Sequence, residues 1–103
     1  MINLTAEAAK QIRLSAKESN LQGLPLRLAG TRNEDGSIHY GMGFDDVKEE
    51  DTTYTTEGVD LVVSIASKDL LDGMTVDFVE IEPGKPQFIF MNPNDKNYSP
   101  PSE

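Results

Sequence analysis

The feature that most constrains this chain is a pair of alternating apolar stretches separated by a polar loop. Apolar side chains occupy every second position on both sides of the loop: Leu26, Leu28, Ile38, Tyr40, Met42 and Phe44. A period of two predicts half-buried strands. The residues Gly30–Ser37 between them are polar or glycine, and Asn33 to Gly36 form a favourable turn sequence, because Asn and Asp side chains bond nearby backbone groups. The stretch therefore predicts an antiparallel hairpin.

A helix is predicted before the hairpin. Thr5 is a suitable N-cap for a helix that continues to about Asn20, and Gly23 stops it before the hairpin begins. An apolar residue recurs at every fourth position: Leu4, Ala8, Ile12 and Ala16. This spacing lays one apolar stripe along the helix, and its small side chains indicate that the helix packs against a sheet.

The rest of the chain adds strands and one short helix. β-Branched and apolar patterns predict strands over Thr52–Thr56, Val59–Ile65, Met74–Ile81 and Gln87–Met91. The segment Val59–Ile65 is nearly all apolar after Asp60, so it is predicted to be the most central strand. Ser67 is predicted to cap a helix over Lys68–Asp72. Composition and periodicity together predict a mixed α and β domain.

A length of 103 residues fits a single domain. We assign residues 1–94 to this domain and residues 95–103 to a flexible C-terminal tail, because the chain from Asp95 onward is polar or proline.

The charge balance limits the partners. The chain has 9 Lys and Arg against 18 Asp and Glu, a net charge of -9. Proteins bind nucleic acids and anionic membranes through basic residues that neutralise the negative charge of those partners. Because this chain is itself strongly negative, we predict neither as a partner. No apolar run approaches the ~18 residues of a membrane span. The N-terminus also lacks the basic and apolar segment typical of a secretory signal, and we therefore predict a cytoplasmic location.

The chain contains no cysteine and a single histidine, His39. The lack of cysteine excludes disulfides, thiolate zinc sites, thiolate nucleophiles and cysteine-held iron–sulfur clusters. No nucleophile–base pair and no cofactor motif can be named in the sequence. We therefore predict no enzymatic activity, no catalytic residue and no bound cofactor.

Three segments resemble a known family. They are Leu26–Leu28 with the loop that leads to Ile38, Leu71–Val79, and Phe88–Asn94. The second is similar to a Leu-Asp-Gly-x-x-Val/Leu-Asp-Phe pattern and the third to a Phe-x-Phe-x-Asn-Pro-Asn pattern of the A-type iron–sulfur carriers, the HesB/IscA-like proteins. The resemblance implies a mostly β fold with flanking helices (α+β). In that fold a flattened barrel or sandwich of mixed strands carries an N-terminal helix and one short helix.

The resemblance also implies where relatives hold a cluster. The family has one cysteine in the hairpin loop and a Cys-Gly-Cys near the C-terminus, and an ungapped count places these cysteines at Asp35, Ser99 and Pro101. A carboxylate oxygen is a hard donor, whereas clusters are held by soft thiolates. Pro100 and Pro101 also keep the backbone extended where the family has a flexible glycine. We therefore predict that these positions hold no cluster.

Other polar residues have simpler interpretations. Asp35 is interpreted as a solvated turn residue and His39 as a surface or structural histidine. The alternative is a mononuclear iron or manganese site in which His39 binds the metal together with Asp35 or Asp45. A run of carboxylates is predicted to form a solvated acidic rim that could steer a basic partner protein: Asp45, Asp46, Glu49, Glu50 and Asp51.

Gly41 and Gly43 lie on one face of the predicted second hairpin strand. Glycine weakens a strand, so two on one face indicate a close backbone approach, a bulge, or a surface that another element or subunit covers.

Taken together, the resemblance and the missing cysteines predict a non-enzymatic, cysteine-less relative of the iron–sulfur biogenesis carriers that acts by protein–protein contacts. The metal binder described above is the alternative. The expected partners are proteins, iron–sulfur assembly proteins among them, and a homo-oligomer is left open.

Overall fold

A computed structural model describes residues 1–96 as a mostly β structure with two helices. The elements in chain order are β1 (Asn3–Leu4), α1 (Ala6–Glu18), β2 (Leu26–Arg32), β3 (Ile38–Phe44), β4 (Thr52–Thr56), β5 (Val59–Val63), α2 (Ile65–Leu71), β6 (Thr75–Glu82) and β7 (Lys85–Met91). The predicted α+β class with mixed strands is therefore confirmed, and no helix in the described part of the chain is long and apolar enough to span a membrane.

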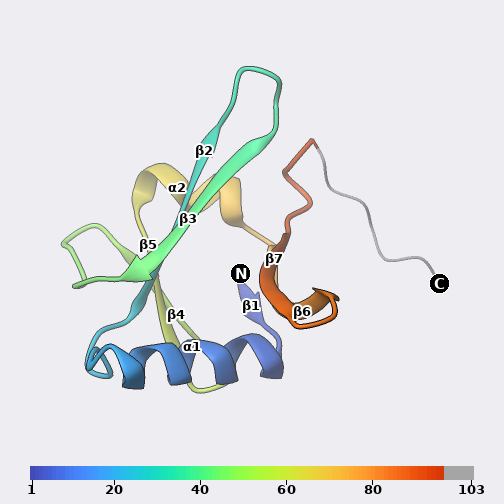
Figure 1. The fold of residues 1–103 in the computed structure, drawn as a ribbon. Helices are drawn as coiled ribbons and strands as arrows, with labels where there is room; N and C mark the ends of the chain where they lie inside the picture. Colours follow the sequence, from blue (N-terminus) through green and yellow to red (C-terminus); the bar gives the residue numbers. More distant parts are fainter. Residues whose placement is uncertain (97–103) are drawn as a thin grey trace.

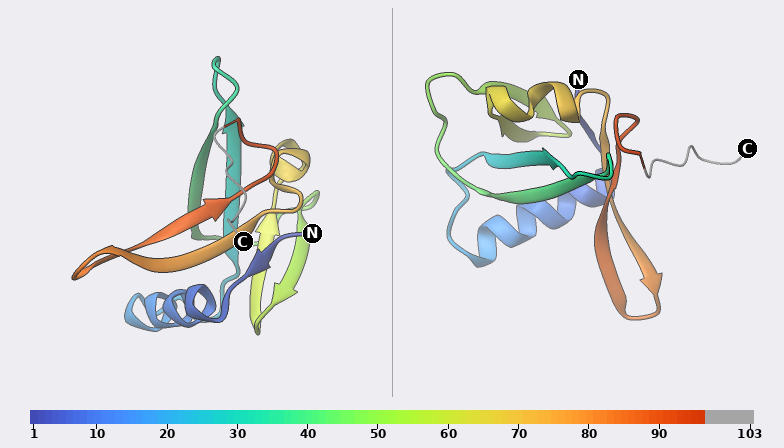
Figure 2. Two further views of the ribbon diagram at one scale, coloured as in Figure 1. Left: turned by 90° about the vertical axis from the view of Figure 1, so that its right-hand side faces the viewer. Right: turned by 90° about the horizontal axis from the view of Figure 1, so that it is seen from above.

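The strands form two sheets, and each contains one parallel pair (Figure 1). The larger sheet has the order β3-β2-β5-β4, in which β2 and β5 run parallel, so β5 is an interior strand as predicted. The smaller sheet has the order β1-β6-β7, in which β1 and β6 run parallel. The β6–β7 hairpin projects beyond the larger sheet (Figure 2).

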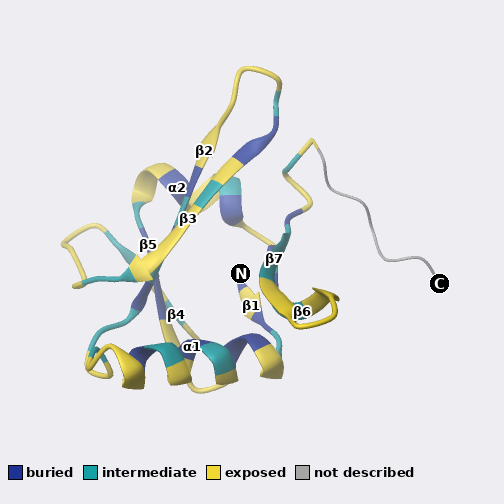
Figure 3. Cartoon of the chain, in the orientation of Figure 1, coloured by how far each residue is buried: buried dark blue, intermediate teal, exposed yellow. Residues whose placement is uncertain are grey.

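The core lies where α1 crosses the two sheets (Figure 3). The predicted stripe on α1 is buried, and the Thr5 side chain caps the helix by accepting a hydrogen bond from the backbone of Ala8 at 3.1 Å. Several aromatic rings are only half-buried at the margin of this core: Tyr40, Phe44, Tyr54, Phe78, Phe88 and Phe90. The interior is built mainly from aliphatic side chains of the N-terminal segment, α1, β2 and β5.

The hairpin and the second helix differ from their predicted bounds. β2 continues to Arg32, beyond the predicted start of the loop at Gly30, although it pairs with β5 only as far as Leu28. Helix α2 begins at Ile65, with Ser64 as its N-cap, so the predicted cap at Ser67 is wrong. Ser67 is instead buried, and its hydroxyl accepts from the Gly30 amide at 3.1 Å and donates to the Gly30 carbonyl at 3.3 Å. The serine thus satisfies backbone groups that β5 no longer reaches.

The acidic segment after β3 is not wholly a solvated rim. Asp51 has a side chain only 3% exposed, and Arg27 of β2 binds it through both of its terminal nitrogens, at 2.6 and 3.0 Å. The Arg27 Nε atom also donates to Asp45 at 2.8 Å, and Lys48 pairs with the same carboxylate. The prediction of a solvated segment is therefore wrong for Asp51, because a single arginine supplies the partner that a nearly buried carboxylate requires.

This cluster predicts a loss of stability in acid. Arg27 and the Lys48 backbone amide lower the pKa of Asp51 from 3.8 to about 2, and Lys48 and Arg27 do the same for Asp45. A depressed folded-state pKa means that the stabilisation is complete above about pH 4 and is lost as the pH falls toward 2. We therefore expect the urea midpoint to fall steeply over this interval.

The matched variants for this test are Arg27→Met and Lys48→Met. We expect Arg27→Met to lower the urea midpoint at pH 7 and to flatten its acid dependence, since it leaves the Asp51 carboxylate without its charged partner. Lys48→Met removes only an exposed ion pair and should change the midpoint little. An acid dependence that Arg27→Met leaves intact would contradict the assignment.

Candidate functional site

The β2–β3 loop is a tight turn closed by its own polar groups. The backbone amide of Asn33 donates to the Ser37 carbonyl at 2.8 Å, and Gly36 adopts a φ of 92°. Asp35 is exposed, and its Oδ1 atom accepts from both the amide and the hydroxyl of Ser37, at 3.0 and 2.5 Å. These two bonds, the hydroxyl first, lower the pKa of Asp35. The carboxylate is therefore ionised at neutral pH and held by the turn.

The Asn92–Asn94 segment after β7 is bound to the C-terminal end of α2. Asn92 is fully buried, and its Nδ2 atom donates to the Leu70 carbonyl at 2.7 Å. Asn94 donates to the carbonyl of Asp72 at 2.8 Å, while its own amide donates to the Asn92 side chain at 3.0 Å. These amides satisfy carbonyls that a helix end leaves without partners. They also direct the chain that follows toward the β2–β3 turn.

The turn and the chain after β7 meet at one end of the molecule (Figure 1). Arg32 joins them, since its Nη1 atom donates to the Gly36 carbonyl at 2.7 Å and its Nη2 atom to the Asn94 carbonyl at 3.2 Å. The Tyr40 hydroxyl donates to Asp95 at 2.7 Å. A methyl group built on Gly36 would lie 3.4 Å from the side chain of Lys96. Tyr40 and Asp95 are 55 positions apart in the sequence. Two segments that are distant in the chain therefore share one surface.

Tyr40 connects this surface to the smaller sheet. Its ring stacks on Phe90 of β7 with a centroid distance of 4.6 Å and an interplanar angle of 9°. Burial and the neighbouring Asp95 carboxylate raise the pKa of Tyr40 to about 12, so the phenol stays protonated and donates. The stacked rings place the end of β7 against β3 and thereby position the segment that follows.

A family model for iron-sulphur cluster biosynthesis matches residues 1–97. The chain belongs to this family. It is similar to the iron-sulfur cluster insertion protein ErpA of Yersinia pestis, with 36% identity over 97 residues that make up 93% of this chain and 84% of the relative. The family identity inferred from the Leu71–Val79 and Phe88–Asn94 patterns is therefore confirmed.

Solved structures of similar proteins share the fold. A crystal structure of IscA with a [2Fe-2S] cluster superposes with a TM-score of 0.75 and 24% identity over 90% of this chain and 86% of that one. Escherichia coli SufA gives a TM-score of 0.70 with 26% identity over the same shares. A solution structure of an Aquifex aeolicus protein gives 0.64 with 31% identity, covering 87% and 89%. The predicted fold, including the short second helix, is confirmed.

The donors at the turn do not fit the cluster that the family name suggests. Of the three positions implied by the family resemblance, the described residues include only Asp35, because Ser99 and Pro101 lie outside them. Asp35 offers hard oxygen donors that already accept hydrogen bonds from Ser37. Clusters of this kind require soft thiolate ligands, and the sequence contains no cysteine. The described residue at a position implied by the resemblance, Asp35, therefore lacks the donor chemistry that such a cluster requires.

Two of the alternative ligands, His39 and Asp45, lie far apart. His39 is exposed on β3 opposite Thr31, on the strand face away from Tyr40. Asp45 follows the far end of β3, about 20 Å from His39 at a typical rise per residue, and is bound by Arg27 and Lys48. Among residues 1–96, no three His, Asp or Glu side chains gather as they would around a metal ion.

Sequence reasoning missed how this surface is held together. Arg32 was counted among the loop residues, and Asp95 was assigned to the flexible tail, yet each bonds the other segment. The one usable signal was the Asn-Pro-Asn pattern, since buried asparagines are normally satisfied by backbone groups. Nothing in the pattern says that those groups belong to α2.

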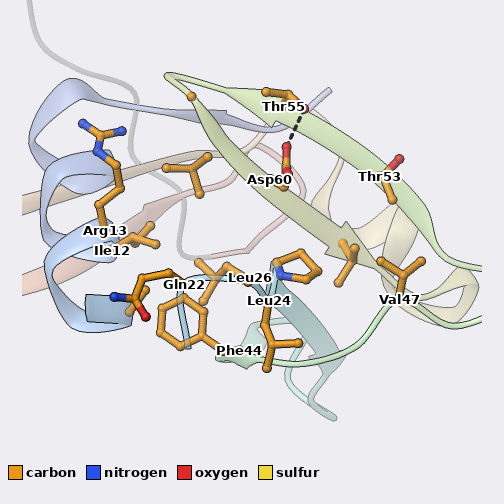
Figure 4. Close-up of a pocket in the computed structure, with 16 residues that line it drawn as sticks. Ile12, Arg13, Gln22, Leu24, Leu26, Phe44, Val47, Thr53, Thr55 and Asp60 are labelled. Atoms are coloured by element: carbon orange, nitrogen blue, oxygen red, sulfur yellow. Dashed lines mark hydrogen bonds between the residues drawn. The ribbon is translucent and has the colours of Figure 1, made fainter. Parts of the chain in front are cut away.

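A separate cavity of about 410 Å³ lies between the C-terminal half of α1 and the β4–β5 hairpin (Figure 4). Its floor is apolar, with Ile12 and Leu26 among its residues, and Phe44 closes one side. The charged residues at its rim are engaged, because Arg13 donates to the Glu57 carbonyl at 2.7 Å and Asp60 accepts from Thr55 at 2.8 Å. Its lining contains no histidine.

Proposed function

We propose that this chain acts in iron–sulfur cluster biogenesis as a non-enzymatic member of its family that binds partner proteins and does not itself hold a cluster. It works in the cytoplasm, and its partners include iron–sulfur assembly proteins. The observation that carries the proposal is the carboxylate of Asp35, which accepts two hydrogen bonds within the turn. The family resemblance implies a cysteine at this position.

Two further features support a role through contacts. The turn and the Asn94–Lys96 segment are bound together by Arg32 and Tyr40, and the surface that they form requires no thiolate. The strong negative charge of -9 favours basic partner surfaces and raises the rate at which they associate. A family member without the cysteine ligands can still act by binding partner proteins.

The test is anaerobic reconstitution with ferrous iron and sulfide, followed by affinity capture from the native cell. We expect a colourless protein without stoichiometric iron that nevertheless retains cluster-assembly proteins. A stable brown species with cluster absorbance would contradict the proposal. Titration with Fe²⁺ and Mn²⁺ should show no stoichiometric binding; binding that is lost in both Asp35→Ala and His39→Ala would point instead to a mononuclear site.

A further inference from the structure

Strand β3 forms a free edge of the larger sheet. It pairs along its whole length with β2, from Ile38 opposite Arg32 to Phe44 opposite Leu26, and no strand within residues 1–96 pairs with its other side. Figure 2 shows this edge at the margin of the sheet in its left view. An edge strand presents a row of backbone donors and acceptors to any extended chain.

The residues that present these groups can be identified from the ladder. The Asp45 amide donates to the Pro25 carbonyl, and the Asn33 amide donates to the Ser37 carbonyl, so the odd-numbered residues of β3 face β2. Because backbone groups alternate along an antiparallel strand, the N–H and C=O groups of the even-numbered residues point to the free edge. These residues are Ile38, Tyr40, Met42 and Phe44.

The other sheet edges are shorter or guarded. β1 has two residues, and β7 begins with Lys85 and Pro86, which are residue types that block strand pairing. β4 has five residues, and its final residue, Thr56, accepts a hydrogen bond from the Leu4 amide at 3.2 Å. β3 has seven residues with no proline, lysine or bulge. Among the described residues, β3 is thus a long edge strand that lacks these protecting features.

Gly41 and Gly43 extend this edge into an open face. A methyl group built on either glycine meets nothing within 4 Å, which excludes a close approach by another segment among the described residues. The β2–β3 register is continuous, which excludes a bulge. The remaining explanation is a surface that another chain covers. A shallow cavity of about 260 Å³ over Ala29 and the two glycines can take a flat side chain.

Charge selects the occupant. Exposed carboxylates lie near both ends of the edge and outnumber the exposed cation of the same segment. Glu34 and Asp35 lie in the turn beside Arg32, and Asp46, Glu49 and Glu50 lie around Lys48 in the segment after β3. A second copy, paired antiparallel about a two-fold axis, would place one acidic end against the other, between chains that each carry a charge of -9. An extended segment with lysine or arginine at its ends meets opposite charge instead.

The geometry points to the β3 edge as a docking site for an extended, basic segment of a partner protein, which adds a fifth strand to the four-stranded sheet. Its apolar side chains continue the face of Tyr40 and Met42, a flat side chain lies over Gly41 and Gly43, and basic residues flank the paired stretch. This inference rests on the proposed function, because it names the surface through which that function would act.

The test uses a labelled synthetic peptide with alternating valine and tyrosine and a lysine pair at each end, followed by fluorescence anisotropy with the full chain. Met42→Pro removes an outward N–H without touching the β2 ladder, so we expect it to weaken binding at least about tenfold. Met42→Ala keeps that group and should change binding less than about threefold. A peptide N-methylated at alternate residues tests the same hydrogen bonds without altering the protein, and should also bind at least about tenfold more weakly.

The contribution of charge is tested with the double variant Glu49→Lys/Glu50→Lys. Its control, Glu80→Lys/Glu82→Lys, makes the same charge change near the β6–β7 turn. We expect the first variant to weaken binding roughly fivefold at low salt, an effect that largely disappears in ~0.5 M salt, and the second to have little effect.

Three results would overturn the inference. They are equal binding of a peptide with glutamate in place of lysine, unchanged binding to Met42→Pro, and a wild-type dimer that Met42→Pro makes monomeric. The last result would assign the edge to a second copy. If Met42→Pro still captures assembly proteins as the wild type does, the docking site is wrong and the proposed function stands. If the wild type captures none, the proposed function fails whatever the peptide does.

Discussion

A variant that combines Asp35→Cys, Ser99→Cys, Pro100→Gly and Pro101→Cys is expected to become brown on anaerobic reconstitution, with iron content rising from near zero to about stoichiometric levels. The wild type is expected to stay colourless. The reason is that soft thiolates are needed to hold the cluster, and glycine between two of them lets the backbone turn both sulfurs toward one iron. The measurements are cluster absorbance together with iron and sulfide content per chain.

The control variant restores the three cysteines without the glycine between the last two. The variant with the same three cysteines but with Pro100 kept should hold markedly less iron, because proline fixes φ and favours an extended chain. Asp35→Cys alone should hold none. Equal clusters in the variants with and without Pro100→Gly would show that donor chemistry is sufficient. A brown wild type would show that oxygen donors suffice and that the chain is a carrier.

Gly30→Val is expected to destabilise the fold by roughly 2–3 kcal/mol, which lowers Tm by roughly 10–20 °C in a domain of this size. Gly30 is buried on β2 beneath α2, and even a single methyl group there would lie 2.9 Å from Leu71 Cδ2 and 3.3 Å from Ile38 Cγ2. Leu71 is fully buried, so it has little room to move aside. Thermal and urea unfolding measure the loss.

Gly43→Val is the matched control on the neighbouring strand. It introduces the same side chain into β3, where nothing lies within 4 Å, so it should leave stability unchanged or raise it by up to about 1 kcal/mol. Similar losses for the two variants would mean that strand glycines matter here for backbone conformation and not for the contact with α2.

Much of the fold could be predicted because local patterns carry it. The alternation in Leu26–Phe44 and the stripe from Leu4 to Ala16 indicate which side of each element is apolar. That side is buried on α1 and β2, whereas on β3 it is only partly buried and Met42 is exposed. The Thr5 cap was equally local, since a threonine side chain bonds an amide three residues away. The predicted cap at Ser67 failed for the converse reason, because its hydroxyl is used by Gly30, a residue 37 positions earlier in the chain.

The candidate site could be predicted only as a list of positions. Asp35 was correctly interpreted as an exposed turn residue, because the Asx turn is a local structure. The acidic segment was judged by composition, which cannot show that Arg27 would bind Asp51 from a neighbouring element. A like-charge run is costly to bury only if no partner of opposite charge is placed against it.

The sequence by itself determined the chemistry that is open to this protein. No arrangement of a chain without cysteine provides a thiolate, and no fold removes the surplus of carboxylates. The tertiary structure alone decided which distant groups meet, such as Arg32 with Asn94 and Tyr40 with Asp95. It also decided that no strand among the described residues pairs with the free edge of β3. The physical reason is that periodicity states which face of an element avoids water, whereas the packing of all elements together decides what covers that face and what is left uncovered.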